Sequence, residues 1–141
     1  MNPTDLVTAW KPSPDWSEMR LRAELLRETR DFFHTHHFLE VETPLLSTDT
    51  VVDAEIDPLS LSWGPDGQKY FLQTSPELCM KRLVAAGGKA LFQITRAFRG
   101  DECGALHNPE FTILEWYRVG DSMQEGIKFL SDLFQALMKT K

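Results

Sequence analysis

The sequence has 141 residues, of which 42% are hydrophobic and 26% are charged, and its 21 acidic and 15 basic side chains give a net charge of -6. This length is enough for one domain with its own core, and the composition is that of a globular protein. The acidic balance argues against a broad nucleic-acid interface, although it says little about a site for one charged ligand.

Targeting and redox signals are weak. No run approaches the roughly 20 apolar residues of a membrane span, and the N-terminal stretch lacks the basic start and apolar centre of a secretory signal. The two cysteines, Cys79 and Cys103, make no disulfide framework. Cys79 is expected to be a small core residue and Cys103 an exposed thiol. We therefore expect a cytoplasmic protein without a membrane segment.

The first predicted element is a helix over about residues 15–36. Its apolar positions recur at helical spacing, at Leu21, Leu25, Thr29 and Phe32. Ser13 is expected to cap this helix, with Pro14 at the first helical position.

Short strands are predicted next. The alternating segment FLEVETP, residues 38–44, predicts a strand that Pro44 stops. A strand is expected at 58–63, a turn at the sequence GPDG, and another strand at 69–73. A second helix then follows, with Ser75 as its cap, Pro76 at the first position, and its end at Gly87 and Gly88.

The second half of the chain predicts two long strands and a final helix. In the strand at 90–99, one face carries Phe92, Ile94 and Phe98, and the other carries Gln93, Thr95, Ala97 and Arg99. One face of the next strand carries Phe111, Ile113, Glu115 and Tyr117. Ser122 and Glu125 form a possible capping box for a helix with apolar residues Ile127, Leu130, Leu133, Phe134 and Leu137. The fold class is α+β, with a largely antiparallel sheet flanked by helices.

The loop between the long strands, FRGDECGALHNPEF, is richer in functional groups than a hairpin needs. Arg99 could form a surface ion pair with Asp101 or Glu102. Alternatively, its planar guanidinium projects over the sheet face and binds a phosphate or carboxylate, with His107 and Asn108 reaching the same ligand.

The strand that follows the loop could extend this site. At about 3.3 Å per residue, Phe111 and Glu115 lie roughly 13 Å apart, which suits an elongated ligand with an aromatic base at one end and a cation at the other. Glu115 could also belong to a solvated face, and Phe111 and Tyr117 to an ordinary core.

Residues 90–118, ALFQITRAFRGDECGALHNPEFTILEWYR, resemble motif 2 of class II aminoacyl-tRNA synthetases, in the lysine-specific branch. The first helix with FLEVETP resembles motif 1, which lies at the dimer interface of that family. The segment TSPELCMKRL resembles the part that holds the substrate's amino group. The resemblance covers about residues 10–118 and implies a class II catalytic fold, ATP and Mg²⁺ as cofactors, and a homodimer formed through the motif 1 region.

Within this branch the sequence is most similar to the elongation factor P–(R)-β-lysine ligases, which modify a protein instead of a tRNA. Only about fifteen residues precede the first helix, where lysyl-tRNA synthetases carry an anticodon-binding barrel. The segments TSPE and EFTILEWYR, with Trp116 and Arg118, also match the ligases. The resemblance implies activation of (R)-β-lysine and transfer to a lysine of elongation factor P, with tRNA not expected as a partner.

The resemblance also implies roles for single residues in binding ATP. Arg99 is the expected catalytic residue, which grips the α-phosphate and the acyl oxygen where charge develops. Asn108 and His107 are expected to hold ATP, with His107 toward the outer phosphates. Phe111 is expected to stack on adenine.

The amino-acid end of the site is expected to contain four further residues. Ser75 and Glu77 receive the amino-acid end, and Glu77 pairs with an ammonium group. Glu115 and Tyr117 line the side-chain pocket, where a carboxylate suits a second ammonium group.

The sequence departs from the family's pattern in two ways. The family has Arg, any residue, then Glu, whereas here Asp101 takes the Glu position and Glu102 follows; either acid could bind the adenine side. No glycine-rich motif 3 follows Arg118, so residues 1–141 are expected to be the N-terminal part of a single catalytic domain, incomplete and inactive alone.

Other interpretations remain open. The chain could be part of a lysyl-tRNA synthetase, or a non-catalytic module that dimerises or binds nucleotide. The histidines of HTHH, at 34, 36 and 37, are expected at the end of the first helix, where the helix dipole favours a positive charge. No Cys or carboxylate completes a ligand set there, so no metal site is predicted.

Overall fold

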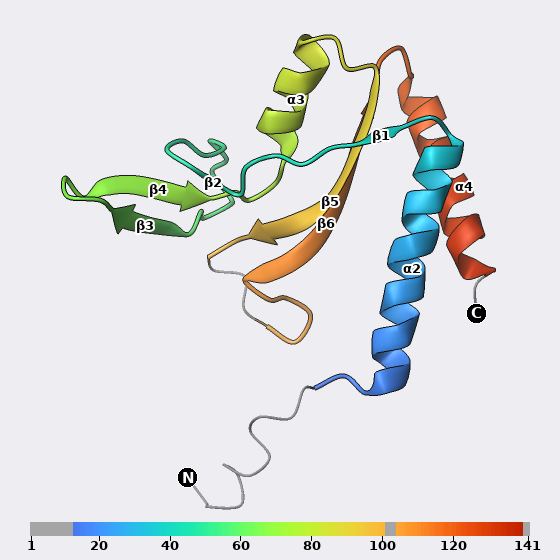
Figure 1. Ribbon diagram of the computed structural model, residues 1–141, viewed down its shortest axis with the longest axis horizontal. Helices are drawn as coiled ribbons and strands as arrows, with labels where there is room; N and C mark the ends of the chain where they lie inside the picture. Colours follow the sequence, from blue (N-terminus) through green and yellow to red (C-terminus); the bar gives the residue numbers. More distant parts are fainter. Residues whose placement is uncertain (1–12, 101–103, 140–141) are drawn as a thin grey trace, which may run out of the picture. The chain divides into compact units, whose positions relative to one another are not determined.

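The computed structural model describes residues 13–100 and 104–139 (Figure 1). These residues form two compact units. The described part of residues 33–123 makes one unit, and residues 13–32 with 124–139 make the other. The elements are α2 (Trp16–Thr35), β1 (Leu39–Glu40), β2 (Leu46–Ser47), β3 (Ser60–Trp63), β4 (Gln68–Leu72), α3 (Glu77–Ala85), β5 (Ala90–Phe98), β6 (Glu110–Arg118) and α4 (Met123–Met138). The mixed helix and sheet content predicted from the sequence is confirmed.

The start of α2 differs from the prediction, because Asp15 and not Ser13 caps it. The Asp15 carboxylate accepts hydrogen bonds from the backbone N–H groups of Ser17 and Glu18, at 2.7 and 2.9 Å. The Asp15 backbone N–H in turn donates to the Glu18 carboxylate, at 2.8 Å. Asp15 and Glu18 therefore form a reciprocal capping box, which leaves Ser13 and Pro14 outside the helix.

The end of α2 shows a structural role for His37 of the HTHH segment. His37 has a φ of 64°, and its N–H donates to the His34 carbonyl, while the Phe38 N–H donates to the Phe33 carbonyl. This is the paired bonding of a Schellman motif, with the Phe33 and Phe38 rings in edge contact at 5.1 Å. His37 therefore reverses the chain direction in a position that usually holds glycine.

The end of α3 uses the same motif with glycine. Gly87 has a φ of 108°, and Gly87 and Gly88 donate to the carbonyls of Val84 and Leu83. At its start, Pro76 is the capping residue, not the first helical residue as predicted, and the Ser75 hydroxyl accepts from the Glu77 N–H at 3.1 Å.

The sheet that positions the site has the order β1-β5-β6. Strands β5 and β6 pair antiparallel over nine residues, from Ala90 opposite Arg118 to Phe98 opposite Glu110. Strand β1 is shorter than the predicted strand at 38–44 and pairs parallel to β5 through two residues only. The sheet is therefore largely antiparallel, as predicted, with one parallel edge.

The two faces of this sheet have different roles. Opposite residues on paired strands share a face, so Phe92 and Trp116 lie together. Phe33, from the last turns of α2, stacks on Phe92 with ring centroids 4.5 Å apart and contacts Trp116 at 5.6 Å. This face is the aromatic core of the unit, and Phe33 and Phe92 are fully buried.

The other face carries the predicted site residues. Gln93 lies opposite Glu115 and Ala97 opposite Phe111, so the strand faces assigned from the sequence meet as expected. This face is not solvated along β5, because Leu91, Gln93 and Ala97 are all buried. Helix α3 contacts both β5 and β6, beside the long curved ribbon in Figure 1.

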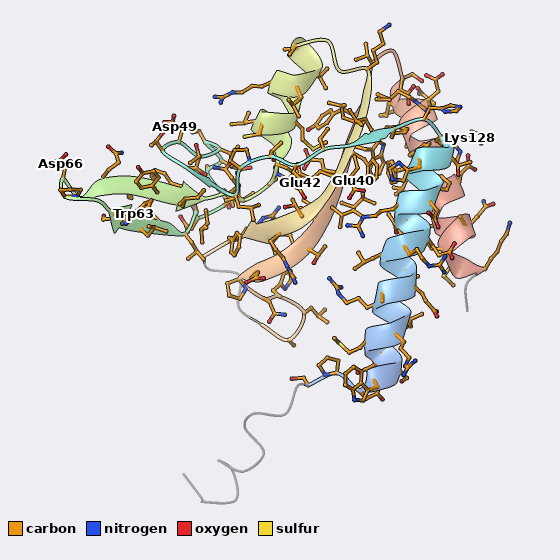
Figure 2. The ribbon with its side chains drawn as sticks, viewed as in Figure 1. Glu40, Glu42, Asp49, Trp63, Asp66 and Lys128 are labelled. Carbon is orange, nitrogen blue, oxygen red and sulfur yellow. The ribbon has the colours of Figure 1, made fainter. Side chains whose placement is uncertain are left out.

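A second sheet has the order β2-β4-β3. Strands β3 and β4 form a hairpin around the predicted GPDG turn, where the Gly67 N–H donates to the Gly64 carbonyl at 3.2 Å. All four residues of β3 are exposed, with Trp63 on the strand and Asp66 at the turn (Figure 2). Because the Phe98 N–H donates to the Gln73 carbonyl, the end of β4 is fixed to the end of β5.

In the other unit, α4 begins directly after Ser122 as predicted, and Phe32 contacts Phe129 at 5.1 Å. Phe129 and Leu133 are buried. Ile127, Leu130 and Phe134, which belong to the predicted apolar set, are exposed. The prediction of the helix was right, but its buried face is centred on Phe129, which the predicted set left out.

Candidate active site

A pocket of about 290 Å³ lies where β5 ends and β6 begins. Four predicted ATP-binding residues line it, namely Arg99, His107, Asn108 and Phe111. Leu106, which the sequence analysis did not select, adds an apolar side chain. Asp101 and Glu102, the other two predicted ATP-binding residues, lie outside the described residues, and so does Cys103.

Arg99 is held over the ring of Phe111. The guanidinium carbon lies 5.0 Å from the ring centroid, which is a cation–π distance. The backbone N–H of Arg99 donates to the Pro109 carbonyl at 2.9 Å, which continues the β5–β6 pairing by one residue. The pocket therefore presents a cation close to the face of an aromatic ring, which suits an anionic ligand with a planar base.

The backbone after Arg99 is fixed by the segment before β3. The Gly100 N–H donates to the Asp57 carbonyl at 2.7 Å. A methyl group at Gly100 would lie 3.2 Å from the same carbonyl oxygen, so a larger residue would force this contact apart. The Gly100–Asp57 contact was not predicted, since nothing local in the sequence links position 57 to position 100.

The predicted amino-acid end of the site forms a second cluster. The Tyr117 hydroxyl donates to the Glu115 carboxylate at 2.6 Å, and Lys81 forms an ion pair with Glu77 one helical turn away on α3. Burial is the main cause that raises the pKa of Glu115; the Tyr117 hydrogen bond lowers it, the Glu77 charge raises it, and the Lys81 charge lowers it. Burial and the Glu115 carboxylate also raise the pKa of Tyr117, so its hydroxyl stays a donor.

Helix α3 contacts β6, and the charges of Glu77 and Lys81 on α3 act on Glu115. The carboxylates of Glu77 and Glu115 and the ammonium group of Lys81 therefore form one group of charges, the carboxylate cluster. Glu77 was expected to pair with a substrate ammonium group; in this structure Lys81 provides that positive charge.

Thr74 connects the pocket with the carboxylate cluster. The Arg99 side chain points its Nε–H toward the Thr74 carbonyl at 3.5 Å, which is a long contact. Thr74 is buried, and the next residue, Ser75, accepts the Glu77 N–H at 3.1 Å. The segment 74–77 therefore runs from the guanidinium of Arg99 to the carboxylate of Glu77.

Gln93 is a further residue of this region that the sequence analysis did not select as part of the site. It lies opposite Glu115, is only 2% exposed, and accepts a hydrogen bond from the Thr43 hydroxyl at 3.0 Å. A buried amide on a strand otherwise rich in apolar residues was the available signal, because buried polar groups need specific partners.

Among the residues that the structure describes, no group of three or more His, Cys, Asp and Glu side chains could hold a metal ion. His34 lies 3.8 Å from the Glu40 carboxylate, and His37 forms the turn after α2. The Mg²⁺ cofactor implied by the resemblance stays a prediction.

None of the helices in the described part of the chain has both the length and the apolar character that crossing a bilayer requires.

Comparison with known proteins agrees with these features. A family model described as tRNA synthetases class II (D, K and N) matches residues 13–141. Proteins named elongation factor P–(R)-β-lysine ligase are 43% identical over 138 residues in Vibrio campbellii and 47% identical over 136 residues in Pseudoalteromonas translucida. These matches cover 95% and 94% of this chain, but only 43% and 42% of the relatives.

The resemblance of the strand–loop–strand segment to the ligases is thus confirmed by similarity along nearly the whole chain. The chain spans less than half the length of the curated relatives that it matches. From its sequence, its sheet and its family match, the chain belongs to the class II tRNA synthetases of the D, K and N type.

Proposed function

We propose that this chain supplies ATP-binding and amino-acid-binding residues of a ligase that activates (R)-β-lysine and transfers it to a lysine of elongation factor P. The observation that carries the proposal is one sheet face with a pocket containing Arg99 and Phe111 and, further along β6, the Glu115–Tyr117 pair. The curated relatives bear the name of this ligase. As a reaction of translation, it is expected in the cytoplasm, in a homodimer formed through the motif 1 region.

The proposed reaction has two steps. In the first, a carboxylate oxygen of the amino acid attacks the α-phosphorus of ATP and pyrophosphate leaves, which gives an acyl adenylate. In the second, the neutral amine of the acceptor lysine attacks the acyl carbon, AMP leaves, and the nitrogen loses a proton as the amide forms.

Arg99 is the residue proposed to stabilise the first step. Negative charge increases on the α-phosphate oxygens as the new bond forms, and a guanidinium held in place beforehand stabilises that charge without reorganisation. Phe111 offers its ring to the adenine, and Asn108 and His107 line the same pocket. Asp101 or Glu102 would complete the adenine side.

The amino acid is proposed to bind along β6 and the start of α3. Its two ammonium groups would face Glu77 and Glu115, while Tyr117 holds the Glu115 carboxylate through its hydroxyl. Ser75 would receive the amino-acid end, because its hydroxyl lies at the start of α3 beside Glu77.

ATP binding is tested with Arg99→Ala and a matched control on the same strand. Removing a hydrogen bond to a charged group costs about 1.5–3 kcal/mol, so Arg99→Ala should weaken ATP binding about tenfold to a hundredfold. Arg96→Ala should have little effect, because Arg96 lies on the opposite face and contacts Thr112 and Glu110. Isothermal titration with ATP measures both variants, and equal affinities for wild type and Arg99→Ala would refute the assigned role.

A lysyl-tRNA synthetase is the second candidate, because the matching family includes the lysine enzymes. The acceptor separates the two. We suggest a chimera in which this chain replaces the matching part of the Vibrio campbellii relative, supplied with ATP, magnesium and labelled (R)-β-lysine. The label should appear on purified elongation factor P and not on bulk tRNA.

The acceptor assay should be run at two salt concentrations, since phosphate contacts make nucleic-acid binding strongly salt-dependent. Label on tRNA alone would favour the synthetase. Label on neither acceptor, with the unmodified relative active in parallel, would favour a module without catalytic function.

A further inference from the structure

Lys81 belongs to the carboxylate cluster but has no role in the proposed reaction. It lies on α3, and its ammonium group pairs with the Glu77 carboxylate. It also acts on Glu115 of β6, because its charge lowers the pKa of that carboxyl group. Lys81 therefore influences both carboxylates that are proposed to face the substrate.

The charges of this cluster can be compared with those of the proposed substrate. With both carboxyl groups ionised, Glu77, Glu115 and Lys81 together carry one net negative charge. A lysine-like amino acid has two ammonium groups and one carboxylate, and so carries one net positive charge. The diamine that remains when its carboxyl group is removed carries two positive charges.

We propose that Lys81 is a built-in counter-ion of the Glu77–Glu115 pair and that it tunes the site for a ligand with one net positive charge instead of two. This inference rests on the proposed function for the identity of the ligand. The ion pair with Glu77 and the position of α3 against β6 carry it. Lys81 is a specificity-determining residue in this scheme and takes no part in bond making.

The simpler explanation is an ordinary ion pair between neighbouring turns of one helix. The chain contains such a pair for comparison, because Lys128 and Asp132 on α4 have the same spacing, with Lys128 exposed (Figure 2). Lys128→Met therefore removes a comparable charge and ion pair from a helix of the other unit. An ordinary helical pair would make the two lysine variants behave alike.

The experiment uses the full 141-residue chain as wild type, Lys81→Met, Lys81→Arg and Lys128→Met. Carbon-13 NMR follows the titration of the Glu115 carboxyl group in each protein. Titration calorimetry then measures the dissociation constants of (R)-β-lysine and of its decarboxylated diamine. The key quantity is the ratio of the diamine constant to the amino-acid constant.

In Lys81→Met, the Glu115 pKa should rise, because the neighbouring positive charge is lost. The ratio should fall about twofold to fivefold, since a half-exposed charge pair contributes up to about 1 kcal/mol. Lys81→Arg should restore both values, and Lys128→Met should change neither.

An unchanged Glu115 pKa, or an unchanged ratio with both ligands bound, would overturn the role of Lys81 and leave the proposed function standing. If wild type binds neither ligand, the selectivity and the proposed amino-acid site both fail. The NMR titration still shows in that case whether Lys81 and Glu115 interact.

Discussion

At the scale of single residues, Glu115 shows how the sheet changes an ordinary carboxylate. The side chain lies on a β6 face that α3 contacts, opposite the buried Gln93. Burial destabilises its charged form, whereas the Tyr117 hydroxyl stabilises it. The net effect is a raised pKa. A cationic ligand beside the carboxyl group would lower this pKa again, because a positive charge stabilises the ionised form.

The raised pKa of Glu115 predicts how stability depends on pH. The folded protein holds this proton more tightly than the unfolded chain, so stability should decrease as pH rises from the unfolded value, near 4.5, through the higher folded value. At pH values above the pKa of Glu115 in the folded protein, the loss of stability should no longer depend on pH. Glu115→Gln should remove this decrease, because an amide still accepts the Tyr117 hydrogen bond but does not titrate.

Urea unfolding of wild type and Glu115→Gln at several pH values measures this effect. Glu24→Gln, which changes an exposed glutamate of α2, is the control and should leave the wild-type profile in place. Parallel profiles for wild type and Glu115→Gln would contradict the prediction.

At the scale of elements, the two helix ends of the site-bearing unit are built alike but from different residues. Helix α3 ends with Gly87 in a positive-φ conformation, and α2 ends with His37 in the same conformation. A residue with a side chain pays about 1–2 kcal/mol to adopt a positive φ, and glycine avoids this cost. Glycine also loses more conformational entropy on folding, which offsets part of that advantage.

His37→Gly should therefore stabilise the fold, by up to about 1 kcal/mol, because it relieves this strain and keeps the Schellman hydrogen bonds. His36→Gly is the matched control. It should destabilise the fold, since the His36 N–H bonds to the Phe33 carbonyl without a positive φ that glycine could relieve. Urea denaturation measures both, and a destabilised His37→Gly would show that the His37 side chain contributes more than its strain costs.

At the scale of the whole molecule, stability is expected to be uneven between its two sheets. Strand β5 has a partner on each side and is buried at Leu91, Phe92 and Gln93. Strand β3 is the edge of the other sheet, and every residue in it is exposed. The backbone bonds of β5 should therefore open only in large unfolding events, whereas those of β3 should open locally.

Native-state hydrogen exchange should find the slowest amides in β5 and much faster exchange in β3. Phe33→Ala tests the cause, because it removes the ring that stacks on Phe92 and should speed exchange in β5. Similar exchange rates in the two strands of the wild type would contradict the expected difference.

Local patterns in the sequence were enough to predict much of this molecule. Helical spacing located α2 within one residue at each end, and alternation assigned Phe111, Glu115 and Tyr117 to one face of β6. The resemblance to class II synthetases selected Arg99, His107, Asn108 and Phe111, which the structure brings to one pocket. Their roles in binding ATP stay predictions.

Other features depended on contacts between distant parts of the chain. No short sequence pattern connects β1 with β5, which pair parallel, or Gly100 with Asp57, which share a hydrogen bond. The burial of Gln93 likewise depends on elements that are distant in the sequence. Even the cap of α2 was decided by competition, because Ser13 and Asp15 both fit the capping preference and only Asp15 has Glu18 at the right spacing to bond back.

The sequence by itself therefore determined the types of the longer elements, the faces of the long strands and the chemical groups available for a site. The tertiary structure decided which groups meet: it placed α3 against β6, so that the Lys81 and Glu77 charges act on Glu115. The physical reason is that spacing along the chain fixes the direction of a side chain within its own element. The charges and surfaces that the side chain then meets depend on how distant elements pack.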